Sequence, residues 1–529
     1  MAPSPPRAHY LEKELRNLYP SNLQLEQVQI LLRHGERAPT SARFENAGLA
    51  AFWPYCSAAK QLVSVTMNNN SSTWSHSQWR RHLETFDSHD NPVLVSGPRG
   101  EIEGMCNHGE LTDQGRRSSQ ALGAYLRSLY IDQLGFLPST ISDPEIVYLR
   151  ATRIPRALES LQETFWGMYP PHSRSRIFPP PAVILRAATD ETLNPNNGYC
   201  KRFAQLARAF SRRSAERWNT STEMDYVNDL IGKWMPEDGQ RVAIDSQPRL
   251  SGILDTINST LAHGSGTRLP NEFYDKKGMA IINRLVIEEW FSGYNESQEY
   301  RALGIGSLLG DVVSRMILSI EKNSKENSCQ IKSLDGTSAS IHRPNATVKL
   351  GLSGCHDTTL AAILTSLGAL KLETWPQYTS YVGLELFRKA EESVTAAWKA
   401  DKFPSPGGSA PHIRSNDGLR QPFLPGKATD KKEIVEKAPL IGRKKIDSLQ
   451  PSARSKLDGY YVRILFNDQP VTVPGCKAPG KHLDGNESFC TLEAFKGIVD
   501  KFTPLHWKQD CWSNLNDPTF PVKPEPAGY

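Results

Sequence analysis

The chain has 529 residues, of which 38% are hydrophobic and 22% are charged, and its formal net charge at pH 7 is +5. This length and composition are typical of a globular protein with a large core, in one or two domains, and exclude a fibrous or disordered chain. No stripe of Lys and Arg accompanies the small positive charge, and no window reaches eighteen apolar residues, so neither a nucleic acid partner nor a transmembrane segment is expected.

The cysteines and the N-terminus bear on the compartment. The eight cysteines contain no Cys-x-x-Cys pair, which disfavours zinc and thioredoxin-like sites, and any bridge is most expected in the late group. The first twenty residues contain acids and prolines where a secretory signal needs an apolar core, so an intracellular location, cytoplasmic or mitochondrial, is favoured over secretion. Seven Asn-x-Ser/Thr sequons would suit a secreted chain, and they leave the compartment open. The late group of cysteines, in which a disulfide is most expected, consists of Cys476, Cys490 and Cys511.

A basic turn follows the first predicted strand. Residues 28–32 alternate in the manner of a buried strand, which should end at Arg33. Gly35 then permits a tight turn, and Pro39 cannot donate a hydrogen bond to a neighbouring strand. The loop between them is therefore expected at the carboxyl end of the strand, where open α/β sheets bind their ligands.

This loop places Arg33, His34 and Arg37 within five residues. Positive charges packed so closely repel one another unless an anion lies between them. Arginine offers paired donors to phosphate oxygens, and a neutral imidazole nitrogen can attack phosphorus. The pattern therefore favours a phosphate site, and the alternative is an exposed basic loop without a ligand.

Further along the chain, residues 64–108 are polar and contain four histidines. We expect a surface loop there; a metal site is the alternative, but the histidine spacing matches no common ligand motif. Thr112 is a suitable N-cap for the next helix. A second strand at 145–151 and a helix from about Pro155 follow, with three arginines close to their junction, namely Arg150, Arg153 and Arg156.

The rest of the chain alternates again between helical and strand patterns. A short buried strand is expected at 183–186, and most of the next hundred residues have helical periodicity. A strand from 347 to 352 leads directly into His356 and Asp357 and a helix. Two more strands, at 381–387 and 460–466, flank a long segment rich in Pro, Gly, Ser and Lys, which we expect to be disordered.

Two segments together resemble the histidine acid phosphatases, a branch of the superfamily that includes the phosphoglycerate mutases. They are the basic turn Arg-His-Gly-Glu-Arg-Ala-Pro and the downstream Ser-Gly-Cys-His-Asp-Thr-Thr-Leu. The resemblance implies an α/β fold with a mainly parallel central sheet, flanking helices and an inserted helical domain. The resemblance and the patterns together divide the chain into an N-terminal extension at 1–24, a first core part at 25–196 that includes the polar loop 64–108, a helical cap at 197–345 and a second core part at 346–529. Within the second core part, composition predicts the disordered insert at 392–456, where relatives have a short connection.

The resemblance also implies roles for the residues of both motifs. His34 attacks phosphorus to give a phosphohistidine, Asp357 protonates the leaving alkoxide, and water hydrolyses the phosphoenzyme. The phosphate oxygens would be held by four residues, and neither a metal nor another cofactor is implied. These four are Arg33, Arg37, Arg156 and His356.

The identity of the third phosphate arginine stays open. Many relatives have Asp where Arg153 stands, so either Arg153 or Arg156 is a candidate. Alignment by Ala151 and Thr152 favours Arg156, and salt bridges at the surface are expected for Arg150 and Arg153.

The expected function is acid hydrolysis of a small phosphomonoester. The turn that lacks Asp, together with the Trp and Tyr residues that follow the basic loop, makes the chain most similar to the lysophosphatidic acid phosphatase branch. A phytase is the nearest alternative, and a mutase is disfavoured by the His-Asp pair. From another class, the chain could be a noncatalytic phosphate- or lipid-binding protein of the same fold. The physiological substrate and the oligomeric state are not predicted.

Overall fold

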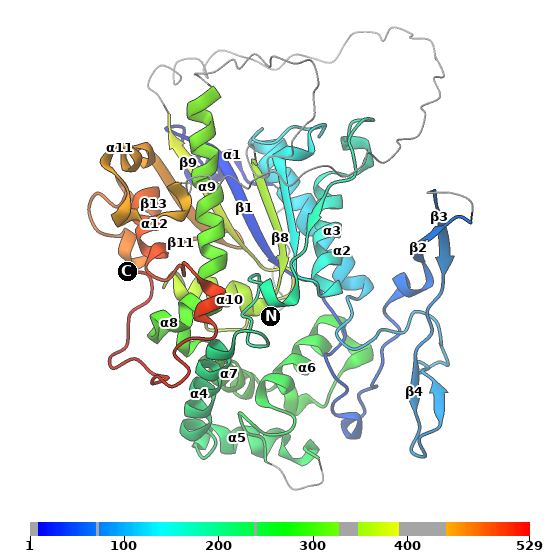
Figure 1. Cartoon of the computed structure of the whole chain (residues 1–529). Helices are drawn as coiled ribbons and strands as arrows, with labels where there is room; N and C mark the ends of the chain where they lie inside the picture. The colour runs from blue at the N-terminus through cyan, green and yellow to red at the C-terminus, as the bar shows by residue number, and fades with distance from the viewer. Residues whose placement is uncertain (1–8, 70–72, 237–240, 327–347, 391–440) are drawn as a thin grey trace, which may run out of the picture.

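The computed structural model describes residues 9–69, 73–236, 241–326, 348–390 and 441–529, which form a central sheet with helices on both faces (Figure 1). Within them, nine strands form one sheet in the order β12-β13-β10-β9-β1-β8-β6-β7, with β11 paired to β10. The predicted α/β class is confirmed. The strands are β1 Leu23–Arg33, β6 Val147–Ala151, β7 Val183–Ile184, β8 Leu350–Cys355, β9 Tyr381–Lys389, β10 Tyr460–Phe466, β11 Gln469–Val471, β12 His482–Leu483 and β13 Asn486–Thr491.

The sheet is mixed, so the prediction of a mainly parallel sheet is wrong. β1, β8, β6 and β7 are parallel, whereas β9 runs antiparallel to β1 and the strands beyond it also pair antiparallel. A run of buried apolar residues suits either direction, because the direction depends on how the chain re-enters the sheet. The parallel half nevertheless contains every strand that leads into a predicted site segment.

Strand β1 is buried on both faces. Val28, Ile30 and Leu32 belong to one apolar cluster, while Leu31 points into another on the opposite face. Gln29, on the same side as Leu31, is also buried, and its amide donates to the carbonyl of Val312. Both faces are therefore occupied, as expected for a central strand of a three-layer fold.

Helices cover both faces of the sheet (Figure 1). On one face Thr112 caps the first helix, because its hydroxyl accepts the Gly115 N–H at 3.3 Å, and Pro155 begins the second, as predicted. The first face is covered by α2 Asp113–Arg127 and α3 Pro155–Met168, and the second by α9 Ser307–Glu326, α10 Asp357–Ser366 and α12 Leu492–Asp500. The shorter helices are α1 Glu12–Leu18, α11 Pro451–Arg454 and α13 Trp507–Asp510.

A helical region follows β7 in the chain and lies below the sheet in Figure 1. The helices before α9 are α4 Lys201–Trp218, α5 Thr222–Ile231, α6 Leu250–His263, α7 Lys276–Glu296 and α8 Gln298–Arg301. Part of this region, made of α5, α6 and the adjoining ends of α4 and α7, forms a separate apolar cluster, which also takes in Phe44, Leu49 and Trp53 from the loop after β1. The remaining buried residues of α4 and α7 belong to the cluster that packs on the sheet. One helix of the described part, Gln298–Glu321, is long and apolar enough to span a membrane, but 89% of its apolar window is buried in the protein, as in a core helix.

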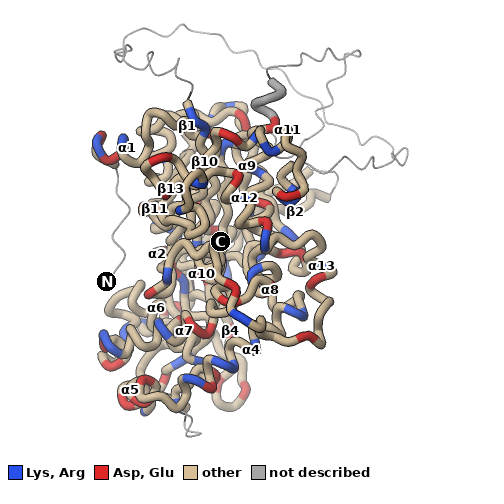
Figure 2. Tube along the Cα trace, turned by 90° about the vertical axis from the view of Figure 1, so that its left-hand side faces the viewer, with Lys and Arg blue, Asp and Glu red and all other residues tan. Residues whose placement is uncertain are grey.

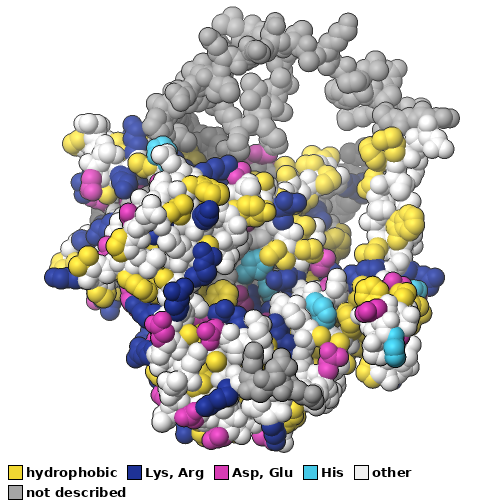
Figure 3. Space-filling view, turned by 60° about the horizontal axis from the view of Figure 1, so that its bottom comes forward, with side chains coloured by type: hydrophobic (Ala, Val, Ile, Leu, Met, Phe, Trp, Pro, Cys, Tyr) yellow, Lys and Arg dark blue, Asp and Glu magenta, His cyan; other side chains and the backbone are white. Residues whose placement is uncertain are grey.

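The polar segment 64–108 lies at the surface, as predicted, but it is not an irregular loop. It forms two antiparallel hairpins, β2 Leu62–Met67 with β3 Trp74–Trp79 and β4 Glu84–Phe86 with β5 Pro92–Leu94. Figure 3 shows that they carry exposed hydrophobic side chains beside the main body. The alternation Val63-Ser64-Val65-Thr66-Met67 is the strand signal that the surrounding Asn, Ser and His residues obscured.

The prediction of a disordered insert at 392–456 is wrong for its last part, residues 441–456. Residues 441–457 fold into short helical turns in which Ile446 and Leu457 are buried, because both side chains reach the core cluster of α9 and α12. The rest of the prediction, 392–440, lies outside the described residues. The strand predicted at 183–186 is reduced to β7, an edge strand that is only partly buried.

The described residues contain three disulfides. Cys476 and Cys490 are paired, which confirms the predicted late bridge, whereas Cys511 pairs with Cys200 across 311 residues. The third disulfide joins Cys56 to Cys106. Charged residues of both signs are interspersed along the described trace, and Figure 2 shows no continuous basic stripe.

Candidate active site

The register of the parallel strands brings the predicted site segments to one edge of the sheet. Arg33 is paired with Cys355 across β1 and β8, and Ala151 is paired with Gly354 across β6 and β8. The three strands therefore end at the same level. The residues that leave these ends are His34, His356 and Thr152, and the backbone N–H of His34 donates to the Cys355 carbonyl at 3.1 Å.

His34 is held in the tautomer that a nucleophile needs. Its Nδ1 lies 2.9 Å from the carbonyl oxygen of Gly35. A carbonyl oxygen only accepts, so Nδ1 carries the proton and Nε2 keeps a free electron pair. Burial, followed by the charges of Arg156 and Arg33, lowers the pKa of His34 well below its usual value. These effects therefore favour the neutral form of His34.

Asp357 is the first residue of α10 and pairs with Arg33, with 2.8 Å between Arg33 Nη2 and Asp357 Oδ2. The same oxygen accepts the indole N–H of Trp375 at 2.8 Å, and Oδ1 accepts the Thr358 backbone N–H at 2.8 Å. Burial raises the pKa of Asp357, but Arg33 and the Trp375 hydrogen bond outweigh it, so the pKa is lowered. These contacts therefore favour the carboxylate form of Asp357.

Arg37 is buried and forms an ion pair with Asp255 of α6. The Thr40 backbone N–H, at 3.2 Å, and the Thr40 hydroxyl, at 3.0 Å, donate to the other oxygen of Asp255. Burial raises the pKa of Asp255, but Arg37 and Thr40 lower it to about 2. A carboxylate from the helical region thus fixes the loop that follows β1.

His356 and Arg156 complete the cluster. The rings of His34 and His356 are 5.5 Å apart between centroids, and Nε2 of His356 lies 3.0 Å from the Thr152 hydroxyl. Burial and the charge of Arg156 lower the pKa of His356 to about 3. Burial and the neighbouring Arg37 lower the pKa of Arg156 to about 10, which shows that positive charge is crowded here.

The three arginines of the second segment have different surroundings. Arg156 faces the cluster, and its Nη1 donates to the Gly109 carbonyl at 3.2 Å, whereas Arg153 is exposed. The structure thus brings Arg156 and not Arg153 to the other predicted residues. The expectation of a surface position for Arg150 is wrong, because this residue is fully buried. Its side chain donates to Glu191 at 2.7 Å and lies 3.8 Å from Asp311 of α9, which covers that face of the sheet.

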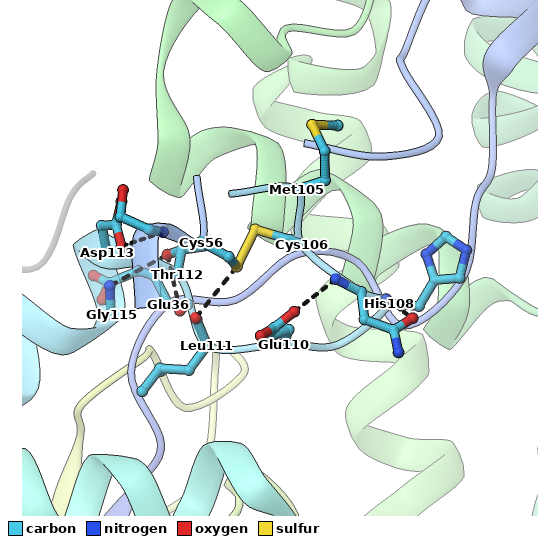
Figure 4. Close-up of a disulfide and its surroundings, with 12 residues drawn as sticks. Glu36, Cys56, Met105, Cys106, His108, Glu110, Leu111, Thr112, Asp113 and Gly115 are labelled. Carbon is cyan, nitrogen blue, oxygen red and sulfur yellow. Dashed lines mark hydrogen bonds between the residues drawn. A yellow bond between two sulfur atoms is a disulfide. The ribbon is translucent and has the colours of Figure 1, made fainter. Parts of the chain in front are cut away.

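Backbone hydrogen bonds join the basic loop to residues 110–112. The N–H of Ala38 donates to the Glu110 carbonyl, and the N–H of Thr112 donates to the Glu36 carbonyl, both at 3.0 Å. Figure 4 shows the Cys56–Cys106 disulfide beside Leu111, whose carbonyl oxygen lies 3.5 Å from Cys56 Sγ. The two backbone hydrogen bonds lie on either side of Arg37 and hold its backbone in place.

Gly35 is needed for close packing and not for an unusual turn. Its backbone is not in the left-handed region. A Cβ at Gly35 would lie 2.2 Å from the carbonyl oxygen of Gly115, at the start of α2. The turn therefore packs directly on a helix end, and any side chain at position 35 would push the two apart.

The cluster opens into a pocket of about 840 Å³ between the sheet edge and the helical region. Arg33, Arg37 and Asp357 line its inner end, while His34 is buried beneath the surface. The rest of the lining is mixed. Its apolar residues include Phe44, Trp234, Leu254, Val286 and Trp290, and its polar residues include Ser41, Arg43, Glu45, Asn46, Arg249 and Asn258. Among the residues that the structure describes, no group of three or more His, Cys, Asp or Glu is arranged to hold a metal ion.

Three contributors to the site were not predicted. Asp255 and Trp375 touch Arg37 and Asp357, and the Tyr378 ring lies 4.0 Å from the Arg33 guanidinium. Neither Asp255 nor Trp375 lies in a motif. Asp255 falls in the long stretch of helical periodicity, and Trp375 lies between the helix after Asp357 and the strand predicted at 381–387. Only folding brings them to the edge of the sheet.

Comparison with known proteins identifies the family. The family model of the histidine phosphatase superfamily (branch 2) matches residues 24–402. "Probable acid phosphatase SPBC4.06" of Schizosaccharomyces pombe is 33% identical over 93% of this chain and 95% of that protein. The lysophosphatidic acid phosphatase type 6 of Bos taurus is 24% identical over 70% of this chain and 75% of that protein.

Among solved structures, the phytase of Hafnia alvei in complex with tartrate covers 93% of this chain and 99% of its own, with 12% identity and a TM-score of 0.49. The family match alone spans more than half of the sequence and includes both motifs at the sheet edge. The chain belongs to branch 2 of the histidine phosphatase superfamily, and it is a phosphatase, as the two motifs predicted.

Proposed function

We propose that the chain is an acid phosphatase that transfers the phosphoryl group of a phosphomonoester to Nε2 of His34. The observation that carries the proposal is the neutral, oriented His34 beside an aspartate at the same edge of the sheet. In the first step the N–P bond forms as the P–O bond to the leaving group breaks, and Asp357 gives the alkoxide its proton. In the second, water attacks phosphorus, Asp357 takes up a proton, and His34 is released.

The positive charges stabilise the transferring group. Arg33, Arg37 and Arg156 are fixed before substrate arrives, so they need no reorganisation when charge builds up on the equatorial oxygens. Because the pKa of Asp357 is lowered, the fraction of Asp357 that carries the proton for the leaving group grows as the pH falls. The activity should therefore be highest in acid.

The apolar part of the pocket lining supports a monophosphate with an apolar body. Of the two outer arginines, Arg249 pairs with Glu289, and Arg43 lies 3.7 Å from Asp255, which it shares with Arg37. A substrate with several phosphates would have to compete with these carboxylates for both outer cations, whereas an acyl chain could lie against Trp234 and Trp290 without such competition. We therefore propose a lysophosphatidic acid-like substrate over an inositol polyphosphate, in agreement with the name of the bovine relative.

The test measures phosphate release from an aryl phosphate between pH 4 and 8 with the wild type, His34→Ala and Asp357→Asn. Acid activity that disappears in His34→Ala, with a trapped acid-labile phosphoenzyme only when His34 is present, would support the mechanism. A folded wild type without activity would favour the noncatalytic binding protein. A higher kcat/KM for inositol hexakisphosphate than for lysophosphatidic acid would overturn the substrate proposal alone.

We also propose that residues 197–345 form a cap over the sheet edge and that the protein works in an oxidising compartment. The separate apolar cluster of α5, α6 and the adjoining ends of α4 and α7 supports the first proposal, and the three disulfides support the second, against the intracellular location favoured by the N-terminus. Mass spectrometry of alkylated protein from its native source tests the compartment. Free thiols at these six cysteines would restore the intracellular expectation.

A further inference from the structure

We infer that Asp255 is a positioning residue that holds the Arg37 guanidinium in place for the transferring phosphoryl group. The inference rests on the proposed phosphatase function and adds to it a residue from outside both motifs. Asp255 comes from α6 in the helical region, whereas Arg37 comes from the loop after β1. The helical region would thereby contribute to catalysis as well as to the shape of the pocket.

The contacts of Arg37 show why it needs such a partner. Its Nη2 donates to Asp255, its Nη1 donates to the Ala38 carbonyl at 3.1 Å, and its Nε is buried without an acceptor. Arg156 lies close enough for its own pKa to be lowered by Arg37. In the absence of a carboxylate, this repulsion would favour side-chain positions of Arg37 further from the other cations.

The environment keeps Asp255 charged under the working conditions. The groups that face it are Arg37, Arg43 and the two donors of Thr40, and they lower its pKa to about 2 although burial opposes this. Because that pKa lies well below the acidic working range, the ion pair persists at every pH where the phosphatase is expected to act. The positioning effect should therefore not depend on pH between 4 and 7.

A double-mutant cycle separates positioning from a general structural role. We would measure kcat/KM for an aryl phosphate, and the affinity for inorganic phosphate by calorimetry, in the wild type, Asp255→Asn, Arg37→Ala and the double variant. Asp255→Asn should lower kcat/KM roughly 10- to 100-fold in the wild type, the size of loss that a misplaced catalytic group causes. In the Arg37→Ala background the same change should cost less than about threefold, because the residue on which it acts is gone.

Three outcomes would overturn the inference: no loss in the wild-type background, the same loss in both backgrounds, or a loss that grows or shrinks across pH 4 to 7. Glu299→Gln is the matched control, because it neutralises the partner of a buried arginine, Arg202, outside the pocket. It should lower thermal stability while kcat/KM stays unchanged. If the wild type is inactive, the proposed function fails, and the coupling of Asp255 to Arg37 is still read from phosphate binding.

Discussion

Two regions of the molecule bury arginines beside carboxylates, and the balance of charge differs between them. At the sheet edge, the ion pairs of the described residues set Asp255 and Asp357 against the three cations Arg33, Arg37 and Arg156, which leaves an excess of positive charge. Between β9 and β10, by contrast, one arginine meets one carboxylate.

That second pair is Arg463 and Glu385, both almost fully buried. Arg463 Nε donates to Glu385 at 2.8 Å, and the hydroxyls of Tyr19 and Tyr130 donate to the other oxygen at 2.7 and 2.9 Å. Its charges are matched, so the pair can hold strands and the N-terminal segment together but has no capacity for an anion. The comparison shows that unmatched buried charge, and not burial of arginine itself, distinguishes a binding site from a structural one.

The largest effect is expected for Asp357→Asn, which removes the proton donor but keeps the side-chain shape. Hydrolysis of an alkyl phosphate should fall roughly 10³- to 10⁴-fold, the upper range for loss of a general acid. An aryl phosphate should lose much less, because its leaving group needs no proton. Equal losses for both substrates, measured as kcat/KM at pH 5, would contradict the role of Asp357.

Mutation of the Arg463–Glu385 pair should change the stability of the fold and leave the catalytic rate unchanged. Glu385→Gln leaves Arg463 buried without its counter-charge, and we expect a loss of about 3–5 kcal/mol in the free energy of unfolding, measured with urea. The kcat of the folded fraction should stay unchanged. The double variant Glu385→Leu with Arg463→Met is the control and should recover much of the stability, since it removes both charges; a further loss would contradict this account.

The excess charge at the site can be tested by comparing two neighbouring arginines. Arg156→Ala should lower kcat/KM roughly 10²-fold, as expected for one lost donor to the transition state. Arg153→Ala is the matched control, since Arg153 is exposed, and its kcat/KM should equal that of the wild type. If kcat/KM fell in Arg153→Ala and not in Arg156→Ala, Arg153 would be the arginine that binds the phosphoryl group.

The smallest effect concerns the indole that donates to Asp357. Trp375→Phe removes a hydrogen bond that stabilises the carboxylate, so the pKa of Asp357 should rise. Because the acid then keeps its proton to higher pH, the fall in kcat/KM on the alkaline side should move upward by up to about one pH unit, worth ~1.4 kcal/mol. A profile that stays in place or moves downward would show that the indole does not tune this group.

Local patterns predicted much of the fold. The end of β1 at Arg33, the Thr112 cap and the Pro155 start are confirmed because each depends on residues close in sequence. Strand direction and the hairpins were predicted wrongly or missed. The direction depends on distant connections, and the hairpin signal is short and lies within polar sequence.

The sequence by itself determined the family and five of the six residues proposed for the chemistry, since both motifs are contiguous and each follows a strand pattern. The sixth, Arg156, lies outside both motifs, and the sequence only favoured it over Arg153. Only the tertiary structure decided what surrounds them. The register of β1, β6 and β8 sets the level at which the three segments meet, and α6 brings Asp255 to Arg37 from 218 residues away. Such charge pairs leave no local periodicity, because they arise only when the chain folds back on itself.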